Sequence, residues 1–573
     1  MRSSLTTRRQ FAAGAALLGM ASLFGVVSPL QAEEDAQDTW TCDVVVLGAG
    51  GAGCAAAALA AQNGASVIVV EKEPWLAGSS SLAIGSFYGA GTQIQKAAGV
   101  DDTPDALLQY FLSRGGDQLD YDVQKFCADH FGETIDWLTQ DLGVEFKEGV
   151  VCKSVDTVPR CHTCANGDVR ALEHVRDYAV EQGVDFRFST SATELVCDDN
   201  GAVIGAMVTT KDGEPVFVSA QKTIVATGGF CRNPQMIATY MPDYADVYTE
   251  VGIGCTGEGL QMGLDIGAAY LGHGGTNGIL ACPVEPGQSK LIAANALWVT
   301  SNGERFAAED GQTHDIYYDV AHFDDQTFYA VYDQALVDSL SDELKEKLQL
   351  GLDLGIFAQG DTVADAAAVL GLDGDAIEQT LADYNALAAD GEDTAFNKKP
   401  ENLVALETAP YYLLKMGVCT HGSFGGYSVN SNLEALNVNG DPIENLYAVG
   451  EVSSGSFIYD DYPGGGCGLS WAYTSGRCAG ENAALAIDTF VSDPTPNDGA
   501  EEVTADLNAI HAAIAPATEG MAFDPHSEKH GDIDCSACHS TQPQTLFCTT
   551  CHNDAQVPEG WAIVEDGAHA NVA

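Results

Sequence analysis

The chain has few basic residues for its size. Its 573 residues include 25 lysines and arginines against 82 aspartates and glutamates, a formal net charge of −57. Nucleic-acid binding needs basic groups placed against phosphates, so this shortage excludes that class of function. It also disfavours binding to anionic membrane surfaces. Charged residues are only 19% of the chain, so the acidity comes from scarce lysine and arginine, and the composition is that of a globular protein of about two to four domains.

Long apolar runs are also missing. Past residue 32, no run reaches the length of about 18 residues that a membrane-spanning helix takes. The N-terminus carries a shorter one, over 11–27, directly after Arg8 and Arg9. The pattern is typical of a twin-arginine export signal, which we assign to 1–32, although an ordinary apolar helix with a basic start is the alternative. We expect a periplasmic or cell-envelope protein, exported by that route and without a transmembrane segment when mature.

A glycine-rich turn follows the first apolar strand of the mature chain. Gly48, Gly50 and Gly53 fit G-x-G-x-x-G, in which the glycines permit a tight turn, close approach to a pyrophosphate and packing of a helix. The helix predicted over 54–62 would turn its N-terminus toward the phosphates. Glu71 ends the second strand, where a carboxylate can bind ribose hydroxyls. These features together predict a dinucleotide site.

The strand and glycine pattern occurs in two separate parts of the chain. Alternating strands and helices are predicted from residue 42 to about Gly229, and the strand-then-glycine pattern returns at 445–451. The segment between is richer in helix signals. We therefore predict an α/β fold class: a Rossmann-like domain formed by 42–270 and 405–490, interrupted by an α+β capping domain at 271–404. A linker follows over 491–522.

The C-terminal segment, 523–573, contains two C-x-x-C-H sequences. In that motif two thiols attach a haem and the histidine binds its iron. One zinc ribbon is the competing interpretation, but a histidine directly after both cysteine pairs favours two covalent c-type haems. The predicted attachment and proximal residues are Cys535, Cys538, His539, Cys548, Cys551 and His552. The histidines available as distal ligands are His526, His530 and His569.

Several motifs, in the same order along 42–490, resemble one family. They include Glu71-Lys72-Glu73-Pro74, Gly78-Ser79-Ser80-Ser81, Ala226-Thr227-Gly228-Gly229, Gly303-Glu304-Arg305-Phe306 and Leu446-Tyr447-Ala448-Val449-Gly450-Glu451. The chain resembles the FAD-dependent fumarate reductase and succinate dehydrogenase flavoprotein superfamily, especially its soluble flavocytochrome c branch. That branch carries its haem domain before the flavoprotein, whereas here the haem motifs come after it.

The resemblance implies FAD, bound between the α/β domain and a mobile cap. The cofactor contacts that it implies are Gly48, Gly50, Gly51, Ala52, Gly53, Glu71, Lys72, Gly78, Ser79, Ser80, Gly85, Thr227, Gly228, Glu451, Gly465, Gly466, Leu469 and Ser470.

The chain departs from the fumarate-reducing members where they bind two carboxylates and donate a proton. This chain has His273-Gly274-Gly275-Thr276-Asn277 where those members have a His-Pro-Thr motif, and Leu291-Ile292-Ala293-Ala294 where they have a Thr-Glu pair. It has Thr313-His314-Asp315 where they have Thr-Arg-Asp, and Tyr462 where they have an arginine. A desolvated carboxylate needs a paired charge, so this loss argues against fumarate and other dicarboxylates.

Tyr462-Pro463-Gly464 resembles instead the ketosteroid dehydrogenase branch, whose tyrosine polarises a substrate carbonyl. A neutral donor on a conjugated carbonyl makes the far alkene carbon electrophilic toward hydride. We predict Tyr462 for that role and His314 as general acid. Tyr459 and His421 are further catalytic candidates, although each of the four residues could equally be a hydrogen-bonded structural group.

The remaining cysteines have weaker signals. Of the 17 cysteines, four belong to the haem motifs. Cys152, Cys161 and Cys164 could form part of a metal or iron–sulfur site, against a disulfide or plain buried thiols. Others, such as Cys54 and Cys467, are expected in the core.

The function expected from these features is a respiratory reductase. Electrons from a membrane quinol-oxidising cytochrome or a small cytochrome c would pass through the haems to FAD and reduce an activated C=C bond of a small organic substrate. One alternative is a dehydrogenase, ketosteroid 1-dehydrogenase-like, that gives electrons to the haems. Another is an electron-transfer cytochrome with an inactive flavoprotein fold.

Overall fold

The computed structural model describes residues 32, 36–76, 78–83, 85–115, 118–152, 157–165, 168–245, 247–284, 290–311, 313–460, 462–496, 561–563 and 569–571. Nearly all of the predicted export signal, and most of the linker and cytochrome segment, lie outside these residues.

The first domain is built on a sheet to which eight strands of the described chain belong. Five of them run parallel in the order β16-β8-β1-β2-β5. The strands are β1 (Asp38–Leu47), β2 (Val67–Val70), β5 (Asp185–Arg187), β6 (Ser191–Cys197), β7 (Val203–Thr209), β8 (Pro215–Val225), β15 (Glu434–Leu436) and β16 (Pro442–Ala448). The carboxyl ends of the central parallel strands meet at one edge, where open α/β sheets bind their ligands.

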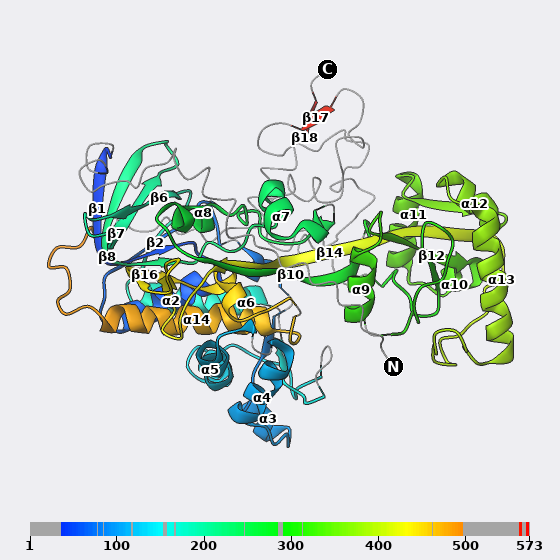
Figure 1. Ribbon diagram of the computed structural model, residues 1–573, viewed down its shortest axis with the longest axis horizontal. Helices are drawn as coiled ribbons and strands as arrows, with labels where there is room; N and C mark the ends of the chain where they lie inside the picture. The colour runs from blue at the N-terminus through cyan, green and yellow to red at the C-terminus, as the bar shows by residue number, and fades with distance from the viewer. Residues whose placement is uncertain are drawn as a thin grey trace.

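Two helices pack against each other on one face of this sheet (Figure 1). They are α2 (Gly51–Gln62), which confirms the helix predicted at 54–62, and α14 (Cys467–Leu485). A Cβ at Gly476 would lie 2.1 Å from the Ala52 carbonyl oxygen, and one at Gly480 would lie 2.0 Å from that of Ala56. The two backbones therefore touch through glycine, which joins the C-terminal part of the domain to its first helix.

The prediction of alternating strands and helices up to Gly229 is wrong for the part before β8. There β6, β7 and β8 form an antiparallel meander, with Ala206 opposite both Leu195 and Val218. Gly201 and Gly213 adopt positive φ angles of 86° and 78° in the two connecting turns. Each glycine follows Asn or Asp, the strongest short-range signal for a hairpin, and this local signal decides the topology.

The cap is built on a second sheet and the helices around it. Its long strands β10 and β14 pair antiparallel and run side by side from the first domain outward (Figure 1). The sheet comprises β9 (Tyr248–Thr249), β10 (Tyr270–Ala281), β11 (Leu297–Val299), β12 (Thr327–Asp333), β13 (Phe357–Gly360) and β14 (Tyr411–Tyr427). Since β14 pairs with β12 and β13, the cap continues beyond the boundary predicted at 404.

Five of the described helices cover the cap, and the remaining described elements lie outside it. The cap helices are α9 (Thr313–Ala321), α10 (Gln334–Asp338), α11 (Asp342–Asp353), α12 (Val363–Val369) and α13 (Gly374–Asp390). The other described elements are β3 (Ser86–Tyr88), α3 (Gln93–Ala97), α4 (Pro104–Gly115), α5 (Tyr121–Gln140), β4 (Cys161–Thr163), α6 (Asp168–Glu181), α7 (Pro234–Tyr240), α8 (Glu258–Asp265), β17 (Trp561–Ile563), β18 (His569–Asn571) and short 3-10 turns at Ser79–Leu82, Pro242–Tyr244, Gly450–Val452 and Ser454–Ser456.

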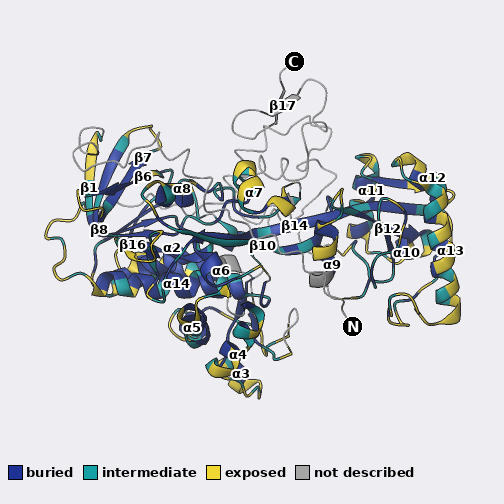
Figure 2. Cartoon of the chain, in the orientation of Figure 1, coloured by how far each residue is buried: buried dark blue, intermediate teal, exposed yellow. Residues whose placement is uncertain are grey.

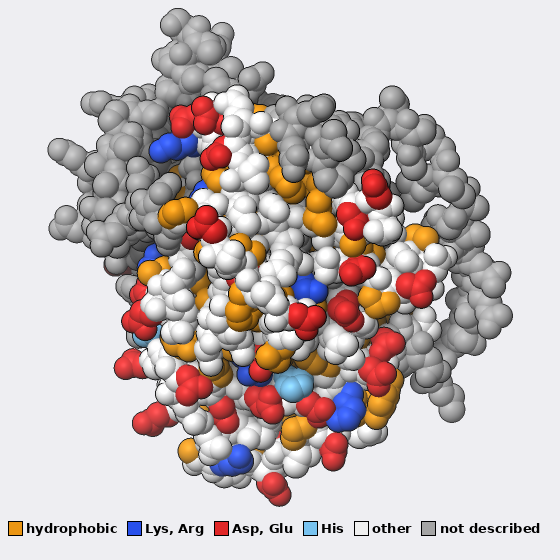
Figure 3. All heavy atoms as spheres, turned by 90° about the vertical axis from the view of Figure 1, so that its left-hand side faces the viewer, with side chains coloured by type: hydrophobic (Ala, Val, Ile, Leu, Met, Phe, Trp, Pro, Cys, Tyr) orange, Lys and Arg blue, Asp and Glu red, His pale blue; other side chains and the backbone are white. Residues whose placement is uncertain are grey.

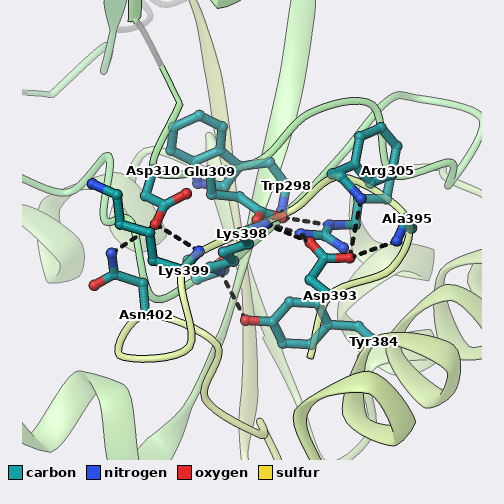
Figure 4. A network of polar contacts seen from close by, with 12 residues as sticks. Trp298, Arg305, Glu309, Asp310, Tyr384, Asp393, Ala395, Lys398, Lys399 and Asn402 are labelled. Atoms are coloured by element: carbon teal, nitrogen blue, oxygen red, sulfur yellow. Dashed lines mark hydrogen bonds and ion pairs between the residues drawn. The ribbon is translucent and has the colours of Figure 1, made fainter. Parts of the chain in front are cut away.

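A buried ion network lies inside the cap (Figure 4). The Arg305 guanidinium donates to Glu309 at 2.9 and 2.8 Å and to Asp393 at 2.8 Å. Lys398 Nζ lies 3.1 Å from Glu309 and donates to the Tyr384 hydroxyl at 2.8 Å. Two cations thus face two carboxylates, so the network carries no net charge and satisfies its own charges away from water.

Buried residues follow the two sheets, while the outer faces of α12 and α13 are exposed (Figure 2). On α13 the buried side chains Ile377, Leu381 and Tyr384 recur every three to four residues, as an amphipathic helix requires. In the described part of the chain, no helix is both long enough and apolar enough to cross a membrane.

Candidate active site

The glycine turn after β1 has the geometry of a phosphate-binding turn. Gly48 has a φ of 105°, and a Cβ there would lie 2.6 Å from the Ala226 carbonyl oxygen. A Cβ at Gly53 would lie 1.9 Å from the Gly48 carbonyl oxygen, whereas one at Gly50 would meet nothing within 4 Å. Gly48 and Gly53 thus allow the turn to pack closely against neighbouring backbone. Gly50 leaves open space at the start of α2, where the N–H groups of a helix N-terminus can bind an anion.

A cavity of about 1140 Å³ opens at this turn and extends between the first domain and the cap. Most of the predicted FAD contacts line it: Gly48, Gly50, Gly51, Ala52, Glu71, Lys72, Gly78, Ser79, Ser80, Thr227, Gly228, Glu451, Gly465, Gly466 and Leu469. The structure brings these residues together from both halves of the discontinuous domain.

Three of the predicted cofactor contacts do not belong to this wall. Gly53 lies beneath the turn, as described above. Gly85 has a φ of 74°, and its carbonyl accepts the Cys164 N–H at 2.7 Å. The Ser470 hydroxyl accepts from the Tyr88 N–H at 2.7 Å and donates to the Tyr88 carbonyl at 2.8 Å. Ser470 therefore ties α14 to β3, a contact between distant segments that its motif does not reveal.

Glu71 and Lys72 lie side by side in sequence but have different environments. Glu71 accepts the N–H groups of Ala49 at 2.8 Å and Glu73 at 3.0 Å. Burial raises the pKa of its carboxyl, and these two amide hydrogen bonds oppose that rise. Lys72 Nζ donates to Thr256 at 2.7 Å and pairs with Glu258 at 3.2 Å. The charge of Lys72 is thus already balanced by Glu258.

Glu451 also lines the cavity. Its Oε1 accepts the Ser423 N–H at 2.9 Å and the Ser423 hydroxyl at 3.1 Å. A Cβ at Gly229 would lie 1.9 Å from the same oxygen. Burial raises the pKa of Glu451, and the Ser423 hydrogen bonds oppose that shift. Glu451, which follows β16, is therefore hydrogen-bonded to Ser423 of β14.

Tyr462 forms part of the cavity wall where the first domain meets the cap. Its ring is stacked on Phe424, with centroids 5.6 Å apart and an interplanar angle of 13°. The Tyr462 oxygen accepts the Gly468 N–H at 2.6 Å. Burial raises the pKa of this phenol well above its usual value, so it stays protonated and can donate its O–H to another acceptor.

His421 shares this wall with a residue that the sequence did not single out. Its Nε2 lies 2.8 Å from Glu250 Oε2, and both residues line the cavity. Glu250 precedes His421 by 171 positions. No motif or spacing connects them, so only the pairing of their strands reveals the contact.

The other two catalytic candidates have different outcomes. Tyr459 contacts His273, with ring centroids 4.3 Å apart and an interplanar angle of 53°, and it is not among the residues of the cavity wall. His314 lies on α9, and its side chain is outside the described part of the structure.

Cationic groups are scarce around the cavity. Among the described lining residues, Lys72 is the sole lysine or arginine. Arg305, from the Gly-Glu-Arg-Phe segment that resembles the family, belongs to the buried ion network of the cap. A pair of carboxylates would therefore find no free guanidinium on the described wall.

The residues present fit FAD. The glycine turn at Gly48, Gly50 and Gly53, together with Glu71, forms a cradle for the cofactor. It offers open space at Gly50 for a pyrophosphate and a buried carboxylate at Glu71 for a ribose. The cavity is large enough to leave room for a substrate beside the cofactor. Gly48, Gly50, Glu71 and Glu451 would hold it.

The thirteen cysteines of the described chain form no disulfide with one another. Of these thirteen, only Cys152 is exposed. Cys152, Cys161 and Cys164 do not form a metal-ligand group in the described residues, where the sole such group is Glu250, Cys419 and His421. The haem residues, Cys535, Cys538, His539, Cys548, Cys551 and His552, and the candidate ligands His526 and His530, lie outside the described residues.

Known proteins are similar in sequence to most of this chain. The family model for an FAD binding domain matches residues 43–469. A probable fumarate reductase, Ifc3, of Shewanella frigidimarina is 30% identical over 78% of this chain and 75% of its own length. Vinyl phenol reductase of Lactiplantibacillus plantarum is 29% identical, covering 77% and 96%.

A solved structure supports the second resemblance. The 3-ketosteroid-Δ4-(5α)-dehydrogenase of Rhodococcus jostii RHA1, in complex with 4-androstene-3,17-dione, has a TM-score of 0.64 and 26% identity, with 80% of this chain and 100% of the other covered. The cradle, the family model and these relatives agree. The chain therefore belongs to the family of FAD-dependent fumarate reductase-type flavoproteins, and it is an FAD-dependent oxidoreductase acting on carbon–carbon bonds.

Proposed function

We propose that this protein is an exported flavocytochrome that reduces the activated C=C bond of a neutral or aromatic-rich enone or acrylate, and not fumarate. One observation carries the choice of substrate class. The described cavity wall presents the Tyr462 phenol and contains no arginine. A neutral carbonyl suits a neutral donor, whereas two buried carboxylates would remain uncompensated.

When bound and reduced, FAD supplies a hydride to one carbon of the alkene. Tyr462 would prepare the substrate by donating its O–H to the carbonyl oxygen, where negative charge develops. The Gly468 N–H on the same phenol oxygen positions it and strengthens its O–H as a donor. Phe424, stacked on the tyrosine, provides a flat apolar surface beside the substrate.

The likeness to vinyl phenol reductase supports an aromatic-rich substrate, since that relative's name refers to one. The likeness to a ketosteroid dehydrogenase, together with the resemblance of the Tyr462-Pro463-Gly464 motif to that branch, favours a second candidate. This is the reverse reaction, in which a saturated ketone gives electrons to FAD. An inactive flavoprotein fold is disfavoured by the intact cradle at Gly48, Gly50, Gly53 and Glu71.

The haem part of the proposal rests on the two C-x-x-C-H motifs in 523–573. Single electrons would enter through the two haems, and FAD would collect them in pairs. The donor would be a membrane quinol-oxidising cytochrome or a small cytochrome c. Acidic side chains are spread over one end of the molecule with few basic ones among them (Figure 3), so a basic donor would be attracted at low ionic strength. The signal at 1–32 would direct export.

The test is an anaerobic reoxidation assay. The purified protein is reduced, then mixed with fumarate, urocanate, methyl cinnamate or an enone steroid, while haem absorbance is followed. We expect rapid reoxidation by at least one neutral alkene and none by fumarate. Fast oxidation by fumarate would refute the substrate class. A pyridine haemochrome assay should give two haems per chain, and a zinc-loaded, colourless protein would refute the haem assignment.

A further inference from the structure

Glu250 and His421 lie on the cavity wall and have no role in the function proposed above. We propose that they form the proton-delivery pair of this enzyme, with Glu250 as the terminal donor and His421 as the residue that recharges it. The inference rests on the proposed function, because an alkene that accepts a hydride must also receive a proton. It goes beyond that function by naming the source of the proton.

The strands of the cap sheet hold the pair in place. β9 and β14 run parallel with Cys419 opposite Tyr248 and Thr420 opposite Thr249. Glu250 is the next residue after β9, and its N–H donates to the Thr420 carbonyl at 2.9 Å. The register therefore places Glu250 beside His421. Glu250 starts from a hydrogen-bonded backbone, and His421 lies within β14 in the irregularity between the paired residues Thr420 and Ser423. Sites on strands are held more rigidly than sites on loops.

Partial exposure makes the pair available to a substrate. The side chains of His421 and Glu250 are 24% and 27% exposed, and both line the cavity. His421 Nδ1 is buried without a hydrogen-bond partner in the described part of the chain. The ring thus has its reactive nitrogen at Nε2, which lies 2.8 Å from Glu250 Oε2. A proton held between these two atoms is at the cavity wall.

The pair shares its wall with the group that would activate the substrate. Phe424 lies three residues after His421 on the same strand, and its ring is stacked on Tyr462. All of these residues line one cavity. The donor that would hold the carbonyl and the pair that would supply the proton therefore line the same cavity.

The proposed step balances as follows. Hydride from the reduced cofactor forms a C–H bond at the carbon remote from the carbonyl, and the alkene π electrons move toward the carbonyl oxygen, giving an enolate bound by Tyr462. The pair enters the step with one shared proton, held between His421 Nε2 and Glu250 Oε2. The N–H bond of the His421 imidazolium breaks as the proton moves to Glu250, which leaves a neutral imidazole. The O–H bond of Glu250 then breaks, its proton forms the second C–H bond at the carbon next to the carbonyl, and solvent returns one proton to His421. The substrate gains two electrons and two hydrogens.

A bound cation is the rival use of the same residues. Cys419 lies on the same strand, and its sulfur, a His421 nitrogen and a Glu250 oxygen all lie within 4.8 Å of one another. These are ligand types that zinc accepts. A zinc ion there would occupy Glu250 and His421 and prevent the proton transfer. Cys419→Ala separates the two possibilities, because it removes a zinc ligand and leaves the proton pair intact.

The experiment compares wild type, Glu250→Gln, His421→Gln and Cys419→Ala, all with bound FAD confirmed by absorbance. Each reduces methyl cinnamate or cyclohex-2-enone with reduced methyl viologen as electron donor, in H2O and in D2O. We expect turnover to fall about 100-fold or more in the Glu250 and His421 variants, the usual contribution of a general acid. In D2O, wild type and Cys419→Ala should give one configuration at the deuterated carbon next to the carbonyl. The other two variants should give both configurations, because water then protonates the enolate from either side.

The other outcomes separate the two proposals. Wild-type turnover and a single configuration in both Glu250→Gln and His421→Gln would overturn the proton pair and leave the proposed function standing. Failure of FAD-loaded wild type to reduce either probe or any alkene of the panel would overturn the function, and the pair with it. Activity that EDTA removes and zinc restores, together with loss of activity in Cys419→Ala, would assign the three residues to a metal and refute the pair.

Discussion

Replacing Tyr462 by phenylalanine removes one oxygen atom from the cavity wall and keeps the ring. Tyr462 is 9% exposed, and its stacking on Phe424 does not involve the hydroxyl. The substitution should therefore leave the shape of the wall unchanged. Any effect on turnover then reports the hydroxyl alone.

Two effects of different size are expected. Loss of one preorganised donor to a developing oxyanion lowers kcat about 100- to 1000-fold, which corresponds to about 3 to 4 kcal/mol. Separately, the Gly468 N–H loses the acceptor that lies 2.6 Å away. An unsatisfied buried amide costs about 1 to 3 kcal/mol of folding stability. The variant should thus be somewhat less stable and far less active.

Tyr427→Phe is the matched control. Its hydroxyl is also buried and donates to the Gly259 carbonyl at 2.6 Å, but Tyr427 does not line the cavity. This variant should lose a similar amount of stability in urea unfolding and keep its kcat. The assay is steady-state reduction of the best alkene of the panel, with FAD content measured on each sample. A Tyr462→Phe protein that binds FAD and keeps the wild-type kcat would refute the role of the phenol.

Three further predictions follow from other parts of the structure. Gly50→Ala should leave the melting temperature of the apoprotein unchanged, because the new Cβ meets only the space meant for the cofactor, and it should weaken FAD binding in a fluorescence titration. Gly53→Ala should instead destabilise the fold by about 1 to 3 kcal/mol, because its Cβ would overlap the turn. Equal effects of the two substitutions would contradict the proposed FAD-binding turn. Arg305→Met leaves two buried carboxylates facing one lysine and should cost about 3 to 5 kcal/mol in urea unfolding, so a loss below 1 kcal/mol would show that the network is not tightly formed. Burial lowers the pKa of His162 to about 4, below its ordinary 6.5, so the fold favours the neutral imidazole. The free energy of unfolding should therefore fall by about 3 kcal/mol as the pH drops from above 6.5 to 4. His162→Gln should show a smaller fall, and parallel curves of stability against pH for the two proteins would contradict this.

Part of the site could be predicted because its residues are close together in sequence. Gly48, Gly50 and Gly53 form one turn, and that turn needs the same backbone geometry in any fold that contains it. Tyr462 could be found because its motif replaces an arginine of the family. Apolar runs alone do not decide the topology before β8, because they look alike in a meander and in a βαβ unit. The turns at Gly201 and Gly213, each preceded by Asn or Asp, distinguish the two.

The rest of the site depends on contacts between distant segments. Ser470 belongs to a cofactor motif, but its hydroxyl bonds to Tyr88 across the domain. Arg305 belongs to a family segment, and the cap encloses it in an ion network. Glu250 has no sequence signal, and it reaches His421 only because β9 and β14 are neighbours. In each case the direction of the side chain is set by packing between elements far apart in the chain.

The sequence by itself therefore determined the family, the cofactor cradle and the shortage of cationic groups, because local spacing and composition persist in any arrangement of the chain. Only the tertiary structure decided which polar groups share the cavity. Tyr462 meets Phe424 where β14 of the cap packs against the first domain, and Glu250 meets His421 because β9 and β14 pair within the cap sheet. Hydrogen bonds between residues so far apart in sequence follow from sheet register, and no short motif encodes that register.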